Sequence, residues 1–355
     1  MTVPVLKALR RANPTLRITV LTRPFFQPFF HDVEGIEFLV PDLNGRHKGL
    51  RGLWRLAAEA RQQGIDAVAD LHDVLRSQVI RRLLRLNGCS VAHIRKGRRE
   101  KRALIRKGYL RSHPLKTTVE RYADVFRRLG LPLAPLSPEP HREHPLSETV
   151  LALTGEKNGC WIGFAPFAKH RGKTYPQELA TQLTALLSEK AEKIFLFGGG
   201  EQERQSAESM AAGHPNVIVV VGKLKLAGEL ELIAHLDAIV TMDSSAMHMA
   251  SLVGTPAVSI WGATHPYAGF LGFGQDPEQV VQLPLPCRPC SVFGDKPCRW
   301  GDWRCLHGID PREIAAKTLL LCGKSNCEKI HNRTPEIDKI NVSLQSKPIE
   351  HNSNQ

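Results

Sequence analysis

The chain has 355 residues, of which 42% are hydrophobic and 23% charged. This length and composition predict two folded domains and exclude a globally disordered chain. No stretch approaches the roughly 18 consecutive apolar residues of a membrane span, and the first residues lack the apolar centre of a secretory signal. We therefore expect a soluble, cytosolic protein.

The formal net charge of +13 is unevenly distributed. Residues 1–150 hold 28 of the 48 Lys and Arg residues but only 14 of the 35 Asp and Glu residues. A basic half beside a neutral half favours an anionic partner, such as nucleic acid, a phosphorylated glycolipid or an acidic membrane surface. A generally arginine-rich composition is the alternative explanation.

The first half alternates helical and strand patterns in chain order. Helical spacing of apolar residues is expected over 2–12, 49–63, 74–87 and 117–129, and short strands over 18–22, 36–40 and 66–71. Such alternation is typical of a parallel sheet covered by helices. We assign residues 1–135 to a first α/β domain and residues 136–150, within a proline-rich stretch, to a linker.

The second half repeats this alternation. Strands are predicted at 160–164, 194–197, 217–221, 237–241 and 256–260, and helices at 176–189, 201–212, 226–236, 245–252 and 311–322. Residues 151–322 therefore form a second doubly wound α/β domain, which leaves a cleft between two Rossmann-like domains. The polar residues 323–355 are predicted to be a disordered tail.

Three loops at predicted strand ends carry groups suited to a phosphorylated ligand. The first, residues 163–176, is basic and includes Lys169 and Lys173. The second joins a strand to a helix through three glycines and Glu201, where backbone can approach a ligand. The third places Asp243 and Ser244 at a helix start, whose free amides suit a diphosphate. A solvated basic loop, a structural glycine turn and an ordinary capped helix are the respective alternatives.

These loops, in this order, resemble those of the ADP-heptose:lipopolysaccharide heptosyltransferases, glycosyltransferase family 9. The resemblance covers about residues 1–322 and rests on the Lys-x-aromatic-Pro sequence at 173–176, the Gly-Gly-Gly-Glu turn at 198–201 and Asp-Ser-Ser-Ala-Met-His at 243–248. The sequence LHDVLRS at 71–77 and a cysteine cluster also match. The family implies a GT-B fold, with an acceptor domain first, a nucleotide-sugar domain second and no required cofactor or metal.

By this resemblance, ADP-heptose is the donor substrate. Lys173 would contact its phosphates, Glu201 would hold the ribose, and His248 would support the loop that binds the diphosphate and heptose. The donor-binding residues implied in this way are Lys169, Lys173, Gly199, Glu201, Asp243, Ser244, Ser245, Ala246, Met247 and His248.

The resemblance also explains the basic first half. The implied acceptor is the inner core of a lipid A/Kdo-type lipopolysaccharide precursor, met at the anionic cytoplasmic face of the inner membrane. Candidate acceptor-binding residues are His72, Arg76, Ser77, Arg98, Arg99 and Lys101. The last three lie in the segment 94–111, for which a solvated charged helix is the alternative. Tyr109 is its one aromatic residue, which argues against a nucleic-acid surface.

This chain departs from the family pattern at its first residues. Family members begin with a strand and a Gly-Asp turn that carries the proposed catalytic base, whereas Met1 here matches the segment just after that turn. We expect a longer reading frame to supply both, and a sheet without this strand to have two open edges. Asp32, Asp70 and Asp73 are poor substitutes, so no base is assigned in this numbering.

Four cysteines cluster at Cys287, Cys290, Cys298 and Cys305. Their spacing admits a structural zinc site or a redox staple, but it lacks the tight second pair of common zinc ribbons. We favour reduced, packed thiols, because a cytosolic chain of this size needs no disulfide framework.

The sequence therefore predicts an inverting glycosyltransferase that moves heptose from ADP-heptose to the lipopolysaccharide inner core. One alternative is a related transferase that uses another sugar nucleotide. The other is a binding protein without turnover, which the missing base would explain.

Overall fold

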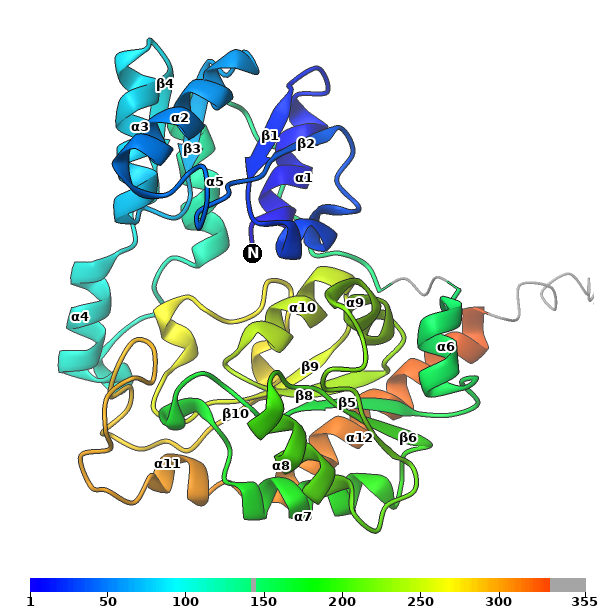
Figure 1. The fold of residues 1–355 in the computed structure, drawn as a ribbon. Helices are drawn as coiled ribbons and strands as arrows, with labels where there is room; N and C mark the ends of the chain where they lie inside the picture. Colours follow the sequence, from blue (N-terminus) through cyan, green and yellow to red (C-terminus); the bar gives the residue numbers. More distant parts are fainter. Residues whose placement is uncertain (142–144, 333–355) are drawn as a thin grey trace, which may run out of the picture.

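The computed structural model describes residues 1–141 and 145–332, and its first half alternates helices with strands (Figure 1). The helices of this half are α1 (Val3–Ala12), α2 (Gly49–Gln62), α3 (Leu75–Leu86), α4 (Arg98–Lys107) and α5 (Thr118–Arg128). The strands are β1 (Ile18–Leu21), β2 (Ile36–Leu39), β3 (Ala67–Asp70) and β4 (Ser90–His93). The predicted strands and helices all form, and β4 and α4 are additional to them.

The strands of the first half form two separate parallel pairs, β1 with β2 and β3 with β4. Within the described residues no ladder joins β1 to β3, so both strands have an open edge. The helices pack against both pairs, since the cores that they close contain residues of β1 or β2 together with residues of β3. Leu9 of α1 and Ala123 of α5 lie in one core, and Leu56 of α2 and Leu84 of α3 in another.

The second half contains one six-stranded parallel sheet in the order β10-β9-β8-β5-β6-β7. Its strands are β5 (Trp161–Ala165), β6 (Lys193–Leu196), β7 (Val217–Val219), β8 (Ala238–Met242), β9 (Ala257–Ile260) and β10 (Val280–Val281). Its helices are α6 (Glu148–Thr154), α7 (Gln177–Ser188), α8 (Glu201–Ala211), α9 (Leu226–Ala234), α10 (Ser245–Val253), α11 (Arg304–His307) and α12 (Pro311–Asn332).

This sheet is covered on both faces, which is why its central strands are continuous apolar runs. In β5, Phe164 points into the core that α7, α8 and α12 close, whereas Trp161 lies in the core closed by α6, α9 and α10. The chain turns from one side of the sheet to the other between β5 and β8, since β6 lies on one side of β5 and β8 on the other. The predicted α/β class with doubly wound parallel sheets is confirmed.

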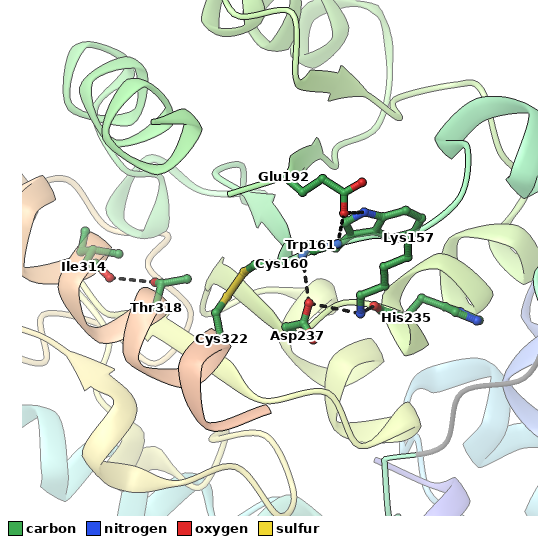
Figure 2. The surroundings of a disulfide bond; sticks show 10 residues. Lys157, Cys160, Trp161, Glu192, His235, Asp237, Ile314, Thr318 and Cys322 are labelled. Atoms are coloured by element: carbon green, nitrogen blue, oxygen red, sulfur yellow. Dashed lines mark hydrogen bonds and ion pairs between the residues drawn. A yellow bond between two sulfur atoms is a disulfide. The ribbon is translucent and has the colours of Figure 1, made fainter. Parts of the chain in front are cut away.

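A disulfide between Cys160 and Cys322 ties α12 to the start of β5 (Figure 2). Beside it, the backbone N–H of Trp161 donates to Asp237 at 2.9 Å, and the Trp161 indole donates to Glu192 at 3.0 Å (Figure 2). The sequence predicted no disulfide framework, so this bond is a difference that only the fold reveals. It joins residues 162 positions apart.

The two halves contact each other at several points. Phe29, in the 3-10 helix Pro24–Phe30, packs against cores of both halves. The segment after α4 is bonded along the second half, because the N–H groups of Leu115 and Thr118 donate to the carbonyls of Tyr267 and Gly269. Helix α4 therefore lies beside the second half, away from the strand pairs (Figure 1).

The helix at the end of the described chain extends beyond the predicted boundary at residue 322. Helix α12 continues to Asn332, so the predicted tail from 323 begins inside a helix, and residues 333–355 lie outside the described residues. Helix α6 likewise begins at Glu148, inside the predicted linker 136–150, of which 142–144 are outside the described residues.

Candidate functional site

A cavity of about 630 Å³ opens at the carboxyl edge of the six-stranded sheet. Loops that follow β5, β6 and β8 line it, at the point where the chain order of the sheet reverses. Parallel α/β sheets bind ligands at this location, because several strand ends and helix N-termini converge there. The size lies within the range of small-molecule sites. All its lining residues belong to the second half, residues 165–293.

The basic loop and the Asp243 loop meet in this cavity. Lys173 Nζ lies 2.9 Å from Asp243 Oδ2 and donates to the Asp243 carbonyl at 3.1 Å. Both side chains are mostly buried, with 14% and 5% exposed. A cation held by a carboxylate in a partly dry site is well placed to meet a phosphate, because its position is fixed in advance.

Lys173 is positioned by a close approach of backbone at Gly172. A Cβ at Gly172 would lie 2.8 Å from the Gly294 carbonyl oxygen and 2.9 Å from the Trp303 ring. The Gly172 carbonyl also accepts from the N–H of Ala263 at 2.8 Å. This contact fixes the turn that carries Lys173 against the loop after β9.

The N-terminus of α10 faces the same cavity without a capping side chain. Ser244 occupies the N-cap position but makes no side-chain cap hydrogen bond, and Ser244, Ser245 and Ala246 line the cavity. The free amides of such a terminus and the helix dipole favour an anion. Met247, the next predicted residue, is fully buried in the protein interior and does not line the cavity.

His248 lies one turn into α10 and also lines the cavity. Burial lowers the pKa of its imidazole to about 3, and the nearby positive charges of the Met1 amino group and Lys173 act in the same direction. Its Nδ1 is buried without a hydrogen-bond partner in the described structure. At neutral pH this histidine is therefore uncharged and has one ring nitrogen free for a polar ligand.

At the glycine turn the structure places Glu203 in the cavity lining, and not the predicted Glu201. Gly199 and Glu203 line the cavity, and Glu203 accepts from the Gly199 N–H at 2.7 Å. Glu201 lies outside the lining, where its exposed carboxylate pairs with Arg204. Its ribose-binding role stays a prediction.

Glu229 of α9 is a lining residue that the sequence analysis missed. Burial raises the pKa of its carboxyl group above the ordinary value. The available signal was its position: Leu226, Leu230 and Ile233 share a helix face with Glu229, so one acidic residue interrupts an apolar stripe. Phe270 and Phe293, 5.9 Å apart between ring centroids, form part of the cavity wall and were also missed.

The predicted acceptor-binding residues lie on the first half, outside the cavity lining. His72 and Arg76 are exposed at the turn between β3 and α3, where Ser77 closes a capping box with the backbone of Val74. Arg98 and Arg99 are exposed on α4. The structure thus separates these residues into two groups, one on α3 and one on α4.

Lys101 of α4 reaches the wall of the cavity from outside. Its Nζ lies 4.0 Å from the centroid of the Phe270 ring. Burial lowers the pKa of this ammonium group to about 8, and the charge of Arg121 adds to the effect. Among the predicted acceptor residues, Lys101 is therefore the one that contacts a cavity-lining side chain.

The carboxylates weighed as replacement bases are engaged by cations. Arg81 Nη1 lies 2.8 Å from Asp70 and 3.0 Å from Asp73. Burial opposes ionisation of Asp73, but the hydrogen bonds from Arg81 and Gln78 outweigh it, so the pKa of Asp73 lies below its ordinary value. Asp32 is exposed beside His31.

The four clustered cysteines are free thiols around a buried arginine. Burial raises the pKa of Cys305 to about 11 and raises that of Cys290. No group of three or more His, Cys, Asp or Glu side chains within the described part of the chain is arranged to hold a metal ion. Arg288, fully buried, donates to the carbonyls of Trp261, Gly262, Thr264 and Leu283 and so fixes this loop.

The architecture is that of a GT-B α/β protein with a cavity at the carboxyl edge of the parallel sheet in its second half. The family model for glycosyltransferase family 9 (heptosyltransferase) matches residues 53–298, and the chain belongs to this family.

Curated relatives are lipopolysaccharide heptosyltransferases. Lipopolysaccharide heptosyltransferase 1 of Pseudomonas aeruginosa is 28% identical over 186 residues, 51% of this chain and 50% of that protein. Its namesake from Escherichia coli K12 is 24% identical over 237 residues, 66% of this chain and 70% of that protein. The chain thus matches about half the length of the first relative.

Solved structures share the fold. The E. coli ADP-heptose heptosyltransferase II structure has a TM-score of 0.64 at 18% identity and covers 91% of this chain and 94% of its own. E. coli heptosyltransferase WaaC with ADP has a TM-score of 0.58 at 21% identity, over 80% of this chain and 89% of its own. A family 9 glycosyltransferase from Veillonella parvula has a TM-score of 0.68 at 19% identity, over 91% and 93%.

Proposed function

We propose that this family 9 glycosyltransferase transfers heptose from ADP-heptose to the inner core of a lipopolysaccharide precursor, with inversion at the anomeric carbon. The Lys173–Asp243 pair beside the uncapped N-terminus of α10 is the observation that carries this proposal. It joins a fixed cation to free backbone amides at one wall of a nucleotide-sized cavity. This combination suits a leaving diphosphate.

In the proposed reaction, an acceptor hydroxyl oxygen forms a bond to the anomeric carbon while the bond from that carbon to the phosphate oxygen breaks. The departing ADP takes the bonding electron pair, and the hydroxyl proton passes to a base that we do not assign in this numbering. Lys173 and the α10 amides stabilise the negative charge that develops on the diphosphate. Asp243 acts as the positioning residue for Lys173.

The other end of the cavity suits the nucleoside. Phe197 and Ile233 provide apolar walls, and Glu203, bonded to the glycine turn, and Glu229 provide carboxyl groups. Carboxyl groups accept hydrogen bonds from ribose hydroxyls or from an exocyclic amine. This arrangement supports a nucleotide donor. A comparison of ADP with UDP tests which nucleobase the site prefers.

The acceptor in this proposal is a phosphate-bearing glycolipid. Its support is the basic surface of the first half, together with family membership. No helix of the described residues is long and apolar enough to cross a membrane. In this proposal the reaction takes place at the cytoplasmic face of the inner membrane, because the lipid-borne acceptor is met there.

The direct test measures heptosyl transfer with Lys173→Ala and Asp243→Ala. We expect each change to lower the rate by about two orders of magnitude or more, on the scale of removing one preorganised charge contact. Lys190→Ala, at an exposed site beyond α7, is the matched control and should leave the rate unchanged. Near-normal transfer by both site variants would contradict the assignment of this loop.

Competition binding separates the alternatives. ADP should displace a labelled ADP-sugar far better than UDP does. Preference for UDP would support a transferase with another sugar nucleotide. ADP binding without any transfer to acceptor would support a binding protein.

A further inference from the structure

Helices α2 and α3 leave large apolar side chains exposed at neighbouring positions. Leu50 and Trp54, one turn apart on α2, are 73% and 65% exposed, and Leu75 at the start of α3 is 76% exposed. The adjacent face of α2, with Leu53 and Leu56, is buried in the core. Exposed leucine and tryptophan side chains of this size indicate an interaction surface when they gather together.

These side chains gather because α2 and α3 run side by side in the same direction (Figure 1). At their C-terminal ends, Arg61 Nη1 donates to Asn87 Oδ1 at 2.8 Å. Their N-terminal turns are therefore neighbours as well. We name Leu50, Arg51, Trp54, Arg55, Leu75 and Arg76 the α2–α3 patch.

The charges around the apolar side chains are basic. Arg51, Arg55 and Arg76 are exposed, and α3 contains no acidic residue. The nearby Glu59 of α2 is already paired, with Arg46 at 3.0 Å and His47 at 3.1 Å. The patch therefore combines apolar side chains with three arginines that form no ion pair within the described residues.

The patch lies at the edge of the first half that carries the predicted acceptor residues. In a parallel α/β unit the first turns of the helices lie at the carboxyl ends of the strands. The turn from β3 to α3 carries His72 and Ser77 next to Leu75. A surface bound here would meet the residues expected to contact the acceptor.

We propose that the α2–α3 patch docks on an anionic phospholipid bilayer. Tryptophan and leucine enter the interfacial region of a membrane, and arginine binds the lipid phosphates near such a surface. A folded protein partner would present charges of both signs, whereas this patch offers one sign only. The inference deepens the proposed function and rests on it for the lipid-borne acceptor.

The test is co-sedimentation of the full chain with vesicles of phosphatidylglycerol and phosphatidylcholine, compared with phosphatidylcholine alone. We expect binding to the anionic vesicles that weakens with added salt. Leu50→Ser with Trp54→Ala should lower partition into them about tenfold or more, since apolar area is lost. Arg51→Gln with Arg55→Gln should lower it by about tenfold and flatten the salt dependence.

The matched control is Leu320→Ser with Trp300→Ala, which removes the same residue types at sites that are 67% and 54% exposed, on α12 and beside Arg299 and Arg304. It should keep wild-type partition. The proposal is overturned if the wild-type chain does not bind anionic vesicles, or if the control lowers partition as much as the patch variants do.

A second readout separates this inference from the proposed function. ADP affinity and transfer to a water-soluble, delipidated acceptor should be unchanged in the patch variants. Vesicle binding without any heptosyl transfer would leave the docking surface intact and refute the proposed function. Heptosyl transfer without vesicle binding would support the proposed function and refute the docking surface.

Discussion

At the scale of single residues, the site depends on how burial changes the chemistry of a few side chains. His248 and Glu229 line the same cavity, and burial disfavours the charged form of both. Lys173 and Asp243 form an ion pair at 2.9 Å. The cavity thus contains one fixed ion pair among groups that burial tends to neutralise.

Glu229 should make stability depend on pH. Its pKa is raised in the folded state, so above its ordinary pKa the folded protein binds more protons than the unfolded chain, and the free energy of unfolding falls as pH rises. Glu229→Gln should therefore be more stable than wild type at pH 7 and equally stable below pH about 4. Urea unfolding at both pH values measures this.

The control for that measurement is Glu34→Gln, at an exposed position in the loop before β2. It should shift neither curve. An equal gain at both pH values would mean that the glutamine packs better, and the titration of Glu229 would then not be the cause. ADP affinity of the same variant reports whether the carboxyl group also contacts the nucleoside.

At the scale of elements, α12 depends on a bond that its own sequence does not reveal. The helix packs against α7 and the central strands, and Cys322 connects it covalently to Cys160 at the start of β5 (Figure 2). Disulfides are rare in reducing compartments. The contribution of this bond therefore depends on the redox conditions in which the protein is studied.

Removing the disulfide should destabilise the oxidised protein. Cross-linking residues 162 positions apart restricts the unfolded chain, so Cys322→Ser should lower the free energy of unfolding by about 2–5 kcal/mol. Chemical denaturation with and without dithiothreitol measures the effect. Reductant should lower the free energy of unfolding of wild type to that of Cys322→Ser. Cys298→Ser, which removes a free thiol, should be as stable as wild type with and without reductant. Equal stability of wild type with and without reductant would contradict the prediction.

At the scale of the whole molecule, the cavity belongs to one half and the predicted acceptor contacts to the other. Helix α4 bridges them, because it belongs to the first half in sequence but contacts Phe270 of the cavity wall through Lys101. Tyr109, just after α4, stacks on His265 with ring centroids 4.3 Å apart. The two halves therefore contact each other beside the cavity.

Lys101→Ala should separate donor binding from acceptor binding. We expect the KM for acceptor to rise by about tenfold, because one charge contact to an anionic substrate is lost, while ADP affinity stays within about twofold of wild type. Calorimetry with ADP and transfer kinetics at varied acceptor measure the two effects. An equal loss of ADP affinity would show instead that Lys101 acts on the donor site through Phe270.

The sequence by itself determined most elements and the loops of the site. Burial of helix faces repeats every three to four residues and buried parallel strands are continuous apolar runs, so α2, α7, β5 and β8 are predictable locally. The basic loop, the glycine turn and Asp243 could be found because strand ends in parallel sheets converge. The missed β4 has only one buried residue, Ala92, and therefore no apolar run, and α4 is so rich in charge that its apolar face is narrow.

Tertiary structure alone decided which of these groups face one another. The pairing of Lys173 with Asp243 and of Cys160 with Cys322 joins positions 70 and 162 residues apart, and the location of Glu203 and Glu229 in the cavity follows from how α8 and α9 pack. The same holds for Lys101 on Phe270 and for the α2–α3 patch. Local patterns specify which face of an element is apolar, but only the packing of elements specifies which faces stay exposed and which charges meet.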